Sequence, residues 1–174
     1  MKAGQLKIYY LEDDGTIPNN PDLPVIIYPS EVEHTDELEN IFHHNQWRNS
    51  WVNGIHEYDH YHSNTHEVLG VIEGHAHIQL GGERGVKATI QKGDVAILPA
   101  GTGHRKIACS PDFKVVGAYP DGARYDTKEG SLKDRPQVLF DIKNAPLPEL
   151  DPVHGNHGPI MKYWIRNRKG ISES

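Results

Sequence analysis

The sequence predicts an all-β fold, either a sandwich or a barrel. From Trp47 onward, apolar and polar residues alternate with a period of two, which is typical of strands rather than helices. The strand-like segments recur at about 8–12 residue spacing and are separated by Gly, Pro, Asn and Asp. The 174 residues include 17 glycines and 12 prolines, which divide the chain into short pieces. These three features together favour a sandwich or barrel.

Strands are expected in eleven segments with this composition. Each is short, and most are bounded by turn-forming residues. In chain order they are QLKIYYL (5–11), VIIY (25–28), NGIHEYDHYH (53–62), EVLGVIEG (67–74), HAHIQLGG (75–82), VKATIQ (86–91), VAILPAG (95–101), HRKIACS (104–110), FKVVGAYP (113–120), VLFDI (138–142) and MKYWIRN (161–167). Residues 121–136 are expected to form an exposed loop, and residues 144–159 an extended proline-rich arm.

One short helix is expected before the alternating region. An apolar stripe with helical spacing follows Thr35, which can cap the first turn. The stripe consists of Leu38, Ile41 and Phe42. A second possible start is the capping box formed by Ser30 and Glu33.

Composition limits the class of protein. The net charge of −6 repels phosphate backbones, so we expect no nucleic-acid partner. No run of about 18 apolar residues is present, so we expect no membrane partner either. The lone cysteine, Cys109, cannot form an internal disulfide and suits a reducing compartment, so we expect the protein in the cytoplasm.

Candidate metal ligands are dense in HYHSNTHE, residues 60–67. In a strand, His60 and His62 would project to the same side, about 6–7 Å apart. If the next strand pairs as a hairpin, Glu67 returns its carboxylate to the same place, and His104 can approach from a later loop. A polar surface strand in a chain with 12 histidines is the alternative.

Two longer motifs contain these residues. Residues 54–74 have the pattern Gly-x5-His-x-His-x4-Glu-x6-Gly, and residues 93–104 have Gly-x5-Pro-x-Gly-x2-His. In this order, with 18 residues between them, they resemble the two motifs of the cupin superfamily. The second motif lacks its final asparagine, which is replaced by Ala108, but that asparagine is not a metal ligand in the family. The whole chain is also similar to small bacterial single-domain cupins.

The resemblance implies a double-stranded β-helix, which is a jelly-roll barrel. The chain length fits one domain over residues 1–174, with the core motifs in 54–108 and with 1–50 and 121–174 as decorating arms. The resemblance further implies one divalent metal ion, held by four side chains: His60, His62, Glu67 and His104. Three imidazoles and a carboxylate suit iron, manganese, nickel, cobalt, copper or zinc.

The function implied is an enzyme of the dioxygenase or isomerase type that acts on a small polar organic molecule. A non-catalytic metal cupin that binds or senses a small ligand is the alternative, and a purely structural ion is a third possibility. The catalytic residues stay unknown. His56, Tyr58 and Lys106 are pocket candidates because they share strand parity with the histidines. A homodimer is expected from the resemblance and from the apolar, proline-flanked terminal arms.

Other histidines compete for these roles. His66 is the rival of Glu67 as a ligand, but Glu67 leaves the six residues before Gly74 that the motif requires. We expect His66 to point outward or to support the ligands. His75 and His77 should lie with Gln79 on a solvated face, because Ala76, Ile78 and Leu80 alternate with them.

Overall fold

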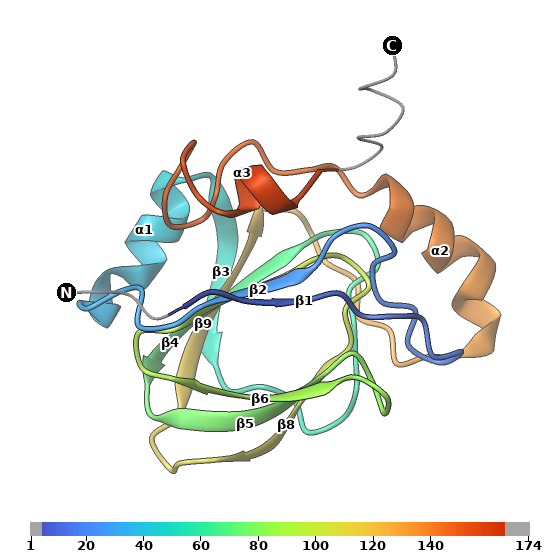
Figure 1. Ribbon diagram of the computed structural model, residues 1–174, viewed down its shortest axis with the longest axis horizontal. Helices are drawn as coiled ribbons and strands as arrows, with labels where there is room; N and C mark the ends of the chain where they lie inside the picture. Colours follow the sequence, from blue (N-terminus) through green and yellow to red (C-terminus); the bar gives the residue numbers. More distant parts are fainter. Residues whose placement is uncertain (1–4, 166–174) are drawn as a thin grey trace.

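Two antiparallel sheets face each other in the computed structural model, which describes residues 5–165 (Figure 1). The larger sheet has the strand order β1-β2-β7-β4-β9-β3, and the smaller sheet has the order β6-β5-β8. The strands are β1 (Lys7–Tyr9), β2 (Val25–Tyr28), β3 (Trp47–Asn53), β4 (Glu67–Glu73), β5 (His75–Leu80), β6 (Val86–Gln91), β7 (Val95–Leu98), β8 (His104–Cys109) and β9 (Lys114–Pro120). The all-β prediction is therefore confirmed.

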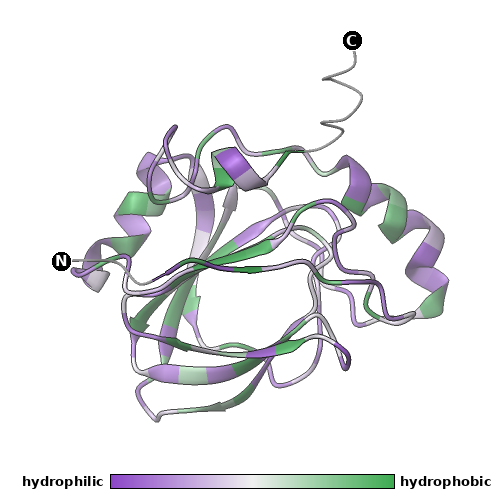
Figure 2. Ribbon diagram, viewed as in Figure 1, coloured by the Kyte–Doolittle hydropathy of each residue, from purple (hydrophilic) through white to green (hydrophobic). Residues whose placement is uncertain are grey.

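The four inner strands of the large sheet, β2, β7, β4 and β9, are buried on both faces, which explains why they are nearly continuously apolar. On β4, Leu69 packs between the sheets with Ile78 of β5, while its neighbour Val68 faces the opposite side. That outer side is covered by α1 (Leu38–His44) and by the C-terminal arm with α3 (Ile160–Tyr163) (Figures 1 and 2). On β5 of the small sheet, the alternation expected for residues 75–80 is observed from His75 to Ile78 and fails at Gln79, which is buried.

The first helix lies where the apolar stripe predicts it, but it starts differently. A 3₁₀ turn over Thr35–Glu37 precedes α1, and the Thr35 hydroxyl donates to the carbonyl of Ile72 instead of capping the helix. Leu38 and Phe42 pack closely on β4 at Gly70, where a Cβ would lie 2.9 Å from the Phe42 ring. The helix is thus fixed by packing rather than by a side-chain cap.

Three predicted strands are wrong. Residues 138–142 lie in α2 (Arg135–Asn144), because Val138 and Ile142 are buried at helical spacing and a proline stands in the first turn. Residues 161–163 lie in α3, and the end of that predicted strand, 166–167, lies outside the described residues. The segment 53–62 leaves β3 after its first residue and continues as irregular backbone. Within residues 5–165, no helix is long and apolar enough to cross a membrane.

A buried carboxylate, Asp151, helps to hold the C-terminal arm on the sheet. Asp151 is 0% exposed and accepts hydrogen bonds from the hydroxyl of Tyr28 on β2 and from three backbone N–H groups of the arm. These belong to Val153, His154 and Ile160. The carboxylate therefore orders the arm around itself and ties it to β2, beside further links in which Trp47 and Asn45 donate to carbonyls of the arm.

Replacing Asp151 with alanine should therefore lower the free energy of unfolding by about 3 kcal/mol or more, since several donors lose their acceptor at once. Urea denaturation followed by tryptophan fluorescence measures this change. Glu149→Ala, an exposed substitution in the same arm, is the control and should leave the midpoint unchanged. Equal midpoints for both variants would contradict this role of Asp151.

Candidate metal centre

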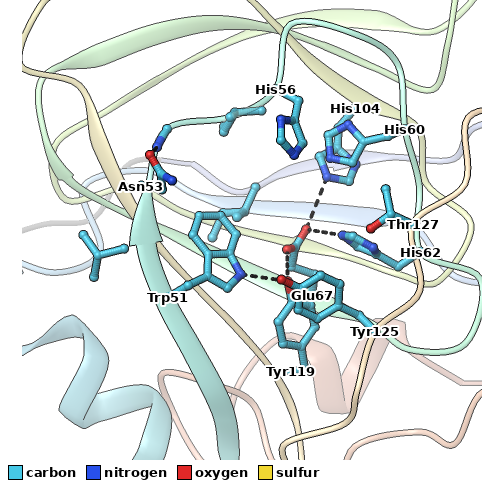
Figure 3. Close-up of a pocket in the computed structure, with 14 residues that line it drawn as sticks. Trp51, Asn53, His56, His60, His62, Glu67, His104, Tyr119, Tyr125 and Thr127 are labelled. Atoms are coloured by element: carbon cyan, nitrogen blue, oxygen red, sulfur yellow. Dashed lines mark hydrogen bonds and ion pairs between the residues drawn. The ribbon is translucent and has the colours of Figure 1, made fainter.

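Four side chains from three chain segments meet at one end of the space between the sheets (Figure 3). His60 and His62 lie in the irregular segment after β3, Glu67 is the first residue of β4, and His104 is the first residue of β8. The predicted hairpin does not form, because β4 pairs with β7 and β9. Instead, the backbone of His60 exchanges two hydrogen bonds with that of His104, at 3.2 and 2.9 Å.

The three imidazoles are oriented by their Nδ1 atoms. Each Nδ1 lies within hydrogen-bonding distance of a backbone carbonyl, which can only accept a proton. The acceptors are Tyr58 for His60, Asp126 for His62 and Thr102 for His104. In the neutral ring, a proton on Nδ1 leaves Nε2 as the unprotonated nitrogen, so three lone pairs face inward.

The ring nitrogens converge closely enough for a single ion. One nitrogen from each of His60, His62 and His104 lies within 4.8 Å of the other two, and all three residues are buried. Glu67 Oε1 lies 3.5 Å from His62 Nε2 and 3.3 Å from His104 Nε2. The four residues singled out in the sequence are therefore neighbours in space.

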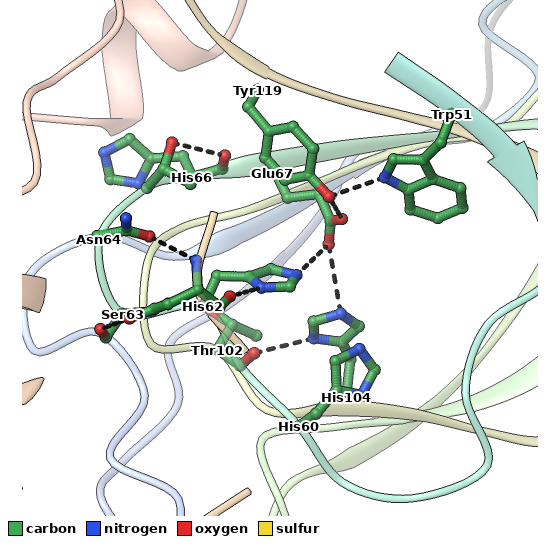
Figure 4. A network of polar contacts seen from close by, with 12 residues as sticks. Trp51, His60, His62, Ser63, Asn64, His66, Glu67, Thr102, His104 and Tyr119 are labelled. Atoms are coloured by element: carbon green, nitrogen blue, oxygen red, sulfur yellow. Dashed lines mark hydrogen bonds and ion pairs between the residues drawn. The ribbon is translucent and has the colours of Figure 1, made fainter. Parts of the chain in front are cut away.

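Glu67 is held from the side opposite the histidines (Figure 4). Its Oε2 accepts a 2.6 Å hydrogen bond from the Tyr119 hydroxyl, which itself accepts one of 2.8 Å from the Trp51 indole. Oε1 is buried and makes no hydrogen bond to any residue in the described part of the chain. One carboxylate oxygen is thus fixed by the protein, while the other is directed at the imidazoles.

The surroundings of the site favour a neutral imidazole at His60 and an ionised carboxylate at Glu67. Burial, aided by repulsion from His104, lowers the pKa of His60 to about 3. Burial also acts against the charged forms of His62 and Glu67, but their mutual attraction outweighs it. The pKa of His62 is therefore raised, and that of Glu67 lies well below its usual value. Burial next to Glu67 raises the pKa of Tyr119, which keeps its phenol protonated as a donor.

Residues 124–128, here called the strap, form one side of the site. The Asp126 carboxylate accepts hydrogen bonds from the backbone N–H and the hydroxyl of Ser63, next to His62. Tyr61 and Lys128 exchange two backbone hydrogen bonds of 2.9 Å. The Tyr125 ring stacks on Tyr119 at 4.4 Å and meets the His62 ring edge-on at 5.0 Å. The predicted exposed loop therefore also positions a candidate ligand.

A cavity of about 240 Å³ opens beside the four residues. Of the three predicted pocket candidates, only His56 is among its lining residues. Tyr58 stacks on the His56 ring at 4.9 Å and is 44% exposed, and the Lys106 ammonium lies 3.8 Å from the Glu57 carboxylate. The strand parity that suggested Tyr58 fails because residues 54–59 are irregular. Lys106 does lie on β8 with His104, but its ammonium lies beside Glu57 rather than in the cavity lining.

Several residues that line the cavity were singled out neither by the two motifs nor by strand parity. Trp51 and Tyr119, which lie outside the predicted ligand set, both line the cavity. Tyr125 and Thr127 line it from the strap. The signal that could have found Tyr119 is its place in β9, which pairs with the strand that carries Glu67.

The competing histidines lie elsewhere. His66 is fully buried on the other side of β4, where its Nδ1 accepts from the N–H of Ala100 and its ring packs 4.7 Å from Trp164. It supports the core and does not point outward. His75 and His77 are on the exposed face of β5, as predicted. Gln79 is not, since it is 5% exposed and donates to the carbonyl of Gly82.

The donor set fits a divalent transition metal. Three imidazole nitrogens and one carboxylate oxygen suit borderline ions such as iron(II), manganese, nickel or zinc. The orphaned Oε1 of Glu67 and the carbonyl-bonded Nδ1 atoms are the arrangement expected around such an ion, because hydrogen bonds to the outer atoms orient the ligands.

Comparison with known proteins agrees with the motifs. A family model described as "Cupin domain" matches residues 51–116. A curated relative, the "Uncharacterized protein YjlB" of Bacillus subtilis, is 43% identical over 162 residues, which cover 93% of this chain and 98% of the relative. Among solved structures, a DUF861 family protein from Thermotoga maritima is 22% identical, with a TM-score of 0.36 over 53% of this chain and 96% of that one. Acireductone dioxygenase from Bacillus anthracis is 17% identical, with a TM-score of 0.36 over 55% of this chain and 61% of that one.

At these TM-scores neither structural similarity bears on activity. The motifs, the barrel, the family match and the full-length relative all indicate one assignment: the chain belongs to the cupin superfamily.

Proposed function

We propose that the protein binds one divalent transition metal ion through His60, His62, Glu67 and His104. The observation that carries this proposal is the convergence of three buried ring nitrogens within 4.8 Å, each ring having its other nitrogen bonded to a carbonyl. A merely structural histidine cluster would gain more from hydrogen bonds to both nitrogens of each ring. The arrangement instead keeps one lone pair per ring free of the backbone.

The other residues of the site hold these ligands in place. Tyr119 fixes the rotamer of Glu67 by donating to Oε2, and Trp51 fixes Tyr119 in turn. The strap carbonyl of Asp126 fixes the tautomer of His62. A bound ion would supply Lewis acidity and, with four protein ligands, would keep open positions for water or a small molecule.

We propose that the metal serves catalysis, as in dioxygenases or isomerases, on a small polar organic molecule. The support is the cavity beside the ligands, because a purely structural ion has closed coordination and needs no adjoining space. A non-catalytic small-ligand binder or sensor is the second candidate, and the same cavity supports it.

Anaerobic reconstitution with iron(II), followed by addition of oxygen and a panel of small acids and phenols, separates these two functions. An oxygenase is expected to consume oxygen in proportion to the substrate added, and an isomerase to convert a substrate with no oxygen uptake. Tight retention of a small molecule without turnover, with several metals tested, would contradict the enzyme and favour the binder.

Replacing His62 or His104 with alanine should remove most of the bound metal, because a site with two imidazoles loses affinity by at least about tenfold. Elemental analysis of the purified proteins measures this loss. His75→Ala, which changes a histidine on the exposed face of β5, is the matched control and should keep full occupancy. Full occupancy in the His104 variant would refute the ligand set.

We further propose a cytoplasmic homodimer. The support is the presence of exposed apolar residues on and beside α2, including Leu132 at 72% and Phe140 at 63% exposure, which a partner could cover. Light scattering at micromolar concentration should give twice the 19.6 kDa chain mass, and a single 19.6 kDa species would contradict the dimer.

A further inference from the structure

We propose that the cavity selects a ligand with a chelating pair of oxygen atoms, a flat apolar body and no more than one negative charge. This inference rests on the proposed metal site, since the metal would hold the oxygen pair. The class of ligand follows from three features of the cavity. It has a fixed aromatic side chain in its wall, no lysine or arginine among its lining residues, and a small volume.

The aromatic wall is Trp51, and the fold holds it rigidly. The register of β3 against β9 shifts between Arg48 and Trp51, and a bulge of this kind re-aims a side chain. The indole then lies over Gly117 of β9, where an added Cβ would meet the ring at 2.4 Å. Its N–H is already bonded to Tyr119, so the indole offers the cavity its apolar ring rather than a donor.

A second aromatic ring, Tyr125, reaches the cavity from the strap. It is 41% exposed although it stacks on Tyr119, so part of its surface is open to a ligand. Ile55 and Leu69 add aliphatic surface to the lining. Rings and aliphatic groups of this kind favour a planar apolar body over a polyhydroxylated one.

Charge limits the rest of the ligand. None of the 14 lining residues is lysine or arginine, and Glu67 is the only lining carboxylate. The two basic residues that follow His104 on β8 have acidic neighbours: Arg105 lies 3.6 Å from Asp59, and Lys106 lies 3.8 Å from Glu57. A divalent ion with one glutamate leaves one net positive charge, which a single anionic group neutralises. A second anionic group would be desolvated without a partner.

The volume of the cavity also limits the ligand. The cavity of about 240 Å³ lies below the roughly 300–1,000 Å³ of pockets that take drug-sized ligands. One ring and a chelating head would fill it, so the ligand is smaller than a nucleotide or a disaccharide.

Three 2-hydroxy acids with the same chelating head test this inference on cobalt(II)-loaded protein. Mandelate carries a phenyl group, lactate a methyl group, and malate a second carboxylate. Titrations followed by cobalt(II) visible absorption should give a dissociation constant for mandelate about tenfold or more below that of lactate, because the phenyl ring is buried. Malate should bind more weakly than lactate.

The variant Trp51→Val should bring the mandelate and lactate constants to within about threefold of each other, while leaving lactate binding measurable. Tyr10→Ala, which changes an exposed aromatic residue that does not line the cavity, is the control and should preserve the mandelate preference. Failure of the wild type to take up cobalt(II) would overturn the metal site and this inference together. Uptake with equal binding of mandelate and lactate, with tightest binding of malate, or with a preference that survives in Trp51→Val, would overturn this inference alone.

Discussion

The site depends on the commitment of three buried imidazoles to backbone carbonyls. Because the Nδ1 atoms of His60, His62 and His104 each face an acceptor, the rings cannot turn without breaking a buried hydrogen bond. The Nε2 atoms of His62 and His104 consequently lie 3.5 and 3.3 Å from Oε1 of Glu67, and the His60 ring contributes the third nitrogen of the cluster. Burying three imidazoles and a carboxylate would cost free energy if each lacked a partner. A cation bound by all four side chains would offset that cost.

The barrel makes this convergence possible by bringing distant segments together. The backbone bridge between His60 and His104 joins the small sheet to the irregular segment after β3, and β4 delivers Glu67 from the large sheet. Residues outside the two motifs complete the site, since the strap orients His62 and β9 supplies Tyr119. The ligands belong to motifs that are visible in the sequence, whereas the residues that support them from the strap and from β9 belong to none.

This difference explains how much the sequence could predict. Alternation at Ala76, Ile78 and Leu80 identified a strand and its exposed face, and the two motifs placed four residues that are indeed neighbours. Alternation failed at Val138 and Ile142, where a short apolar run fits a helix equally well. The roles of Trp51 and Tyr125 depend on a bulge and on loop contacts, which leave no periodic signal. That the whole chain is one domain stays a prediction.

Anomalous diffraction from crystals of the purified protein tests the central claim most directly. Data collected on either side of the absorption edge of the bound metal should give one strong peak among the imidazoles. It should lie roughly 2.0–2.3 Å from Nε2 of His60, His62 and His104 and from Oε1 of Glu67. A map with no anomalous peak there, after the crystals have been soaked in divalent metal, would contradict the account, as would a peak confined to His75 and His77.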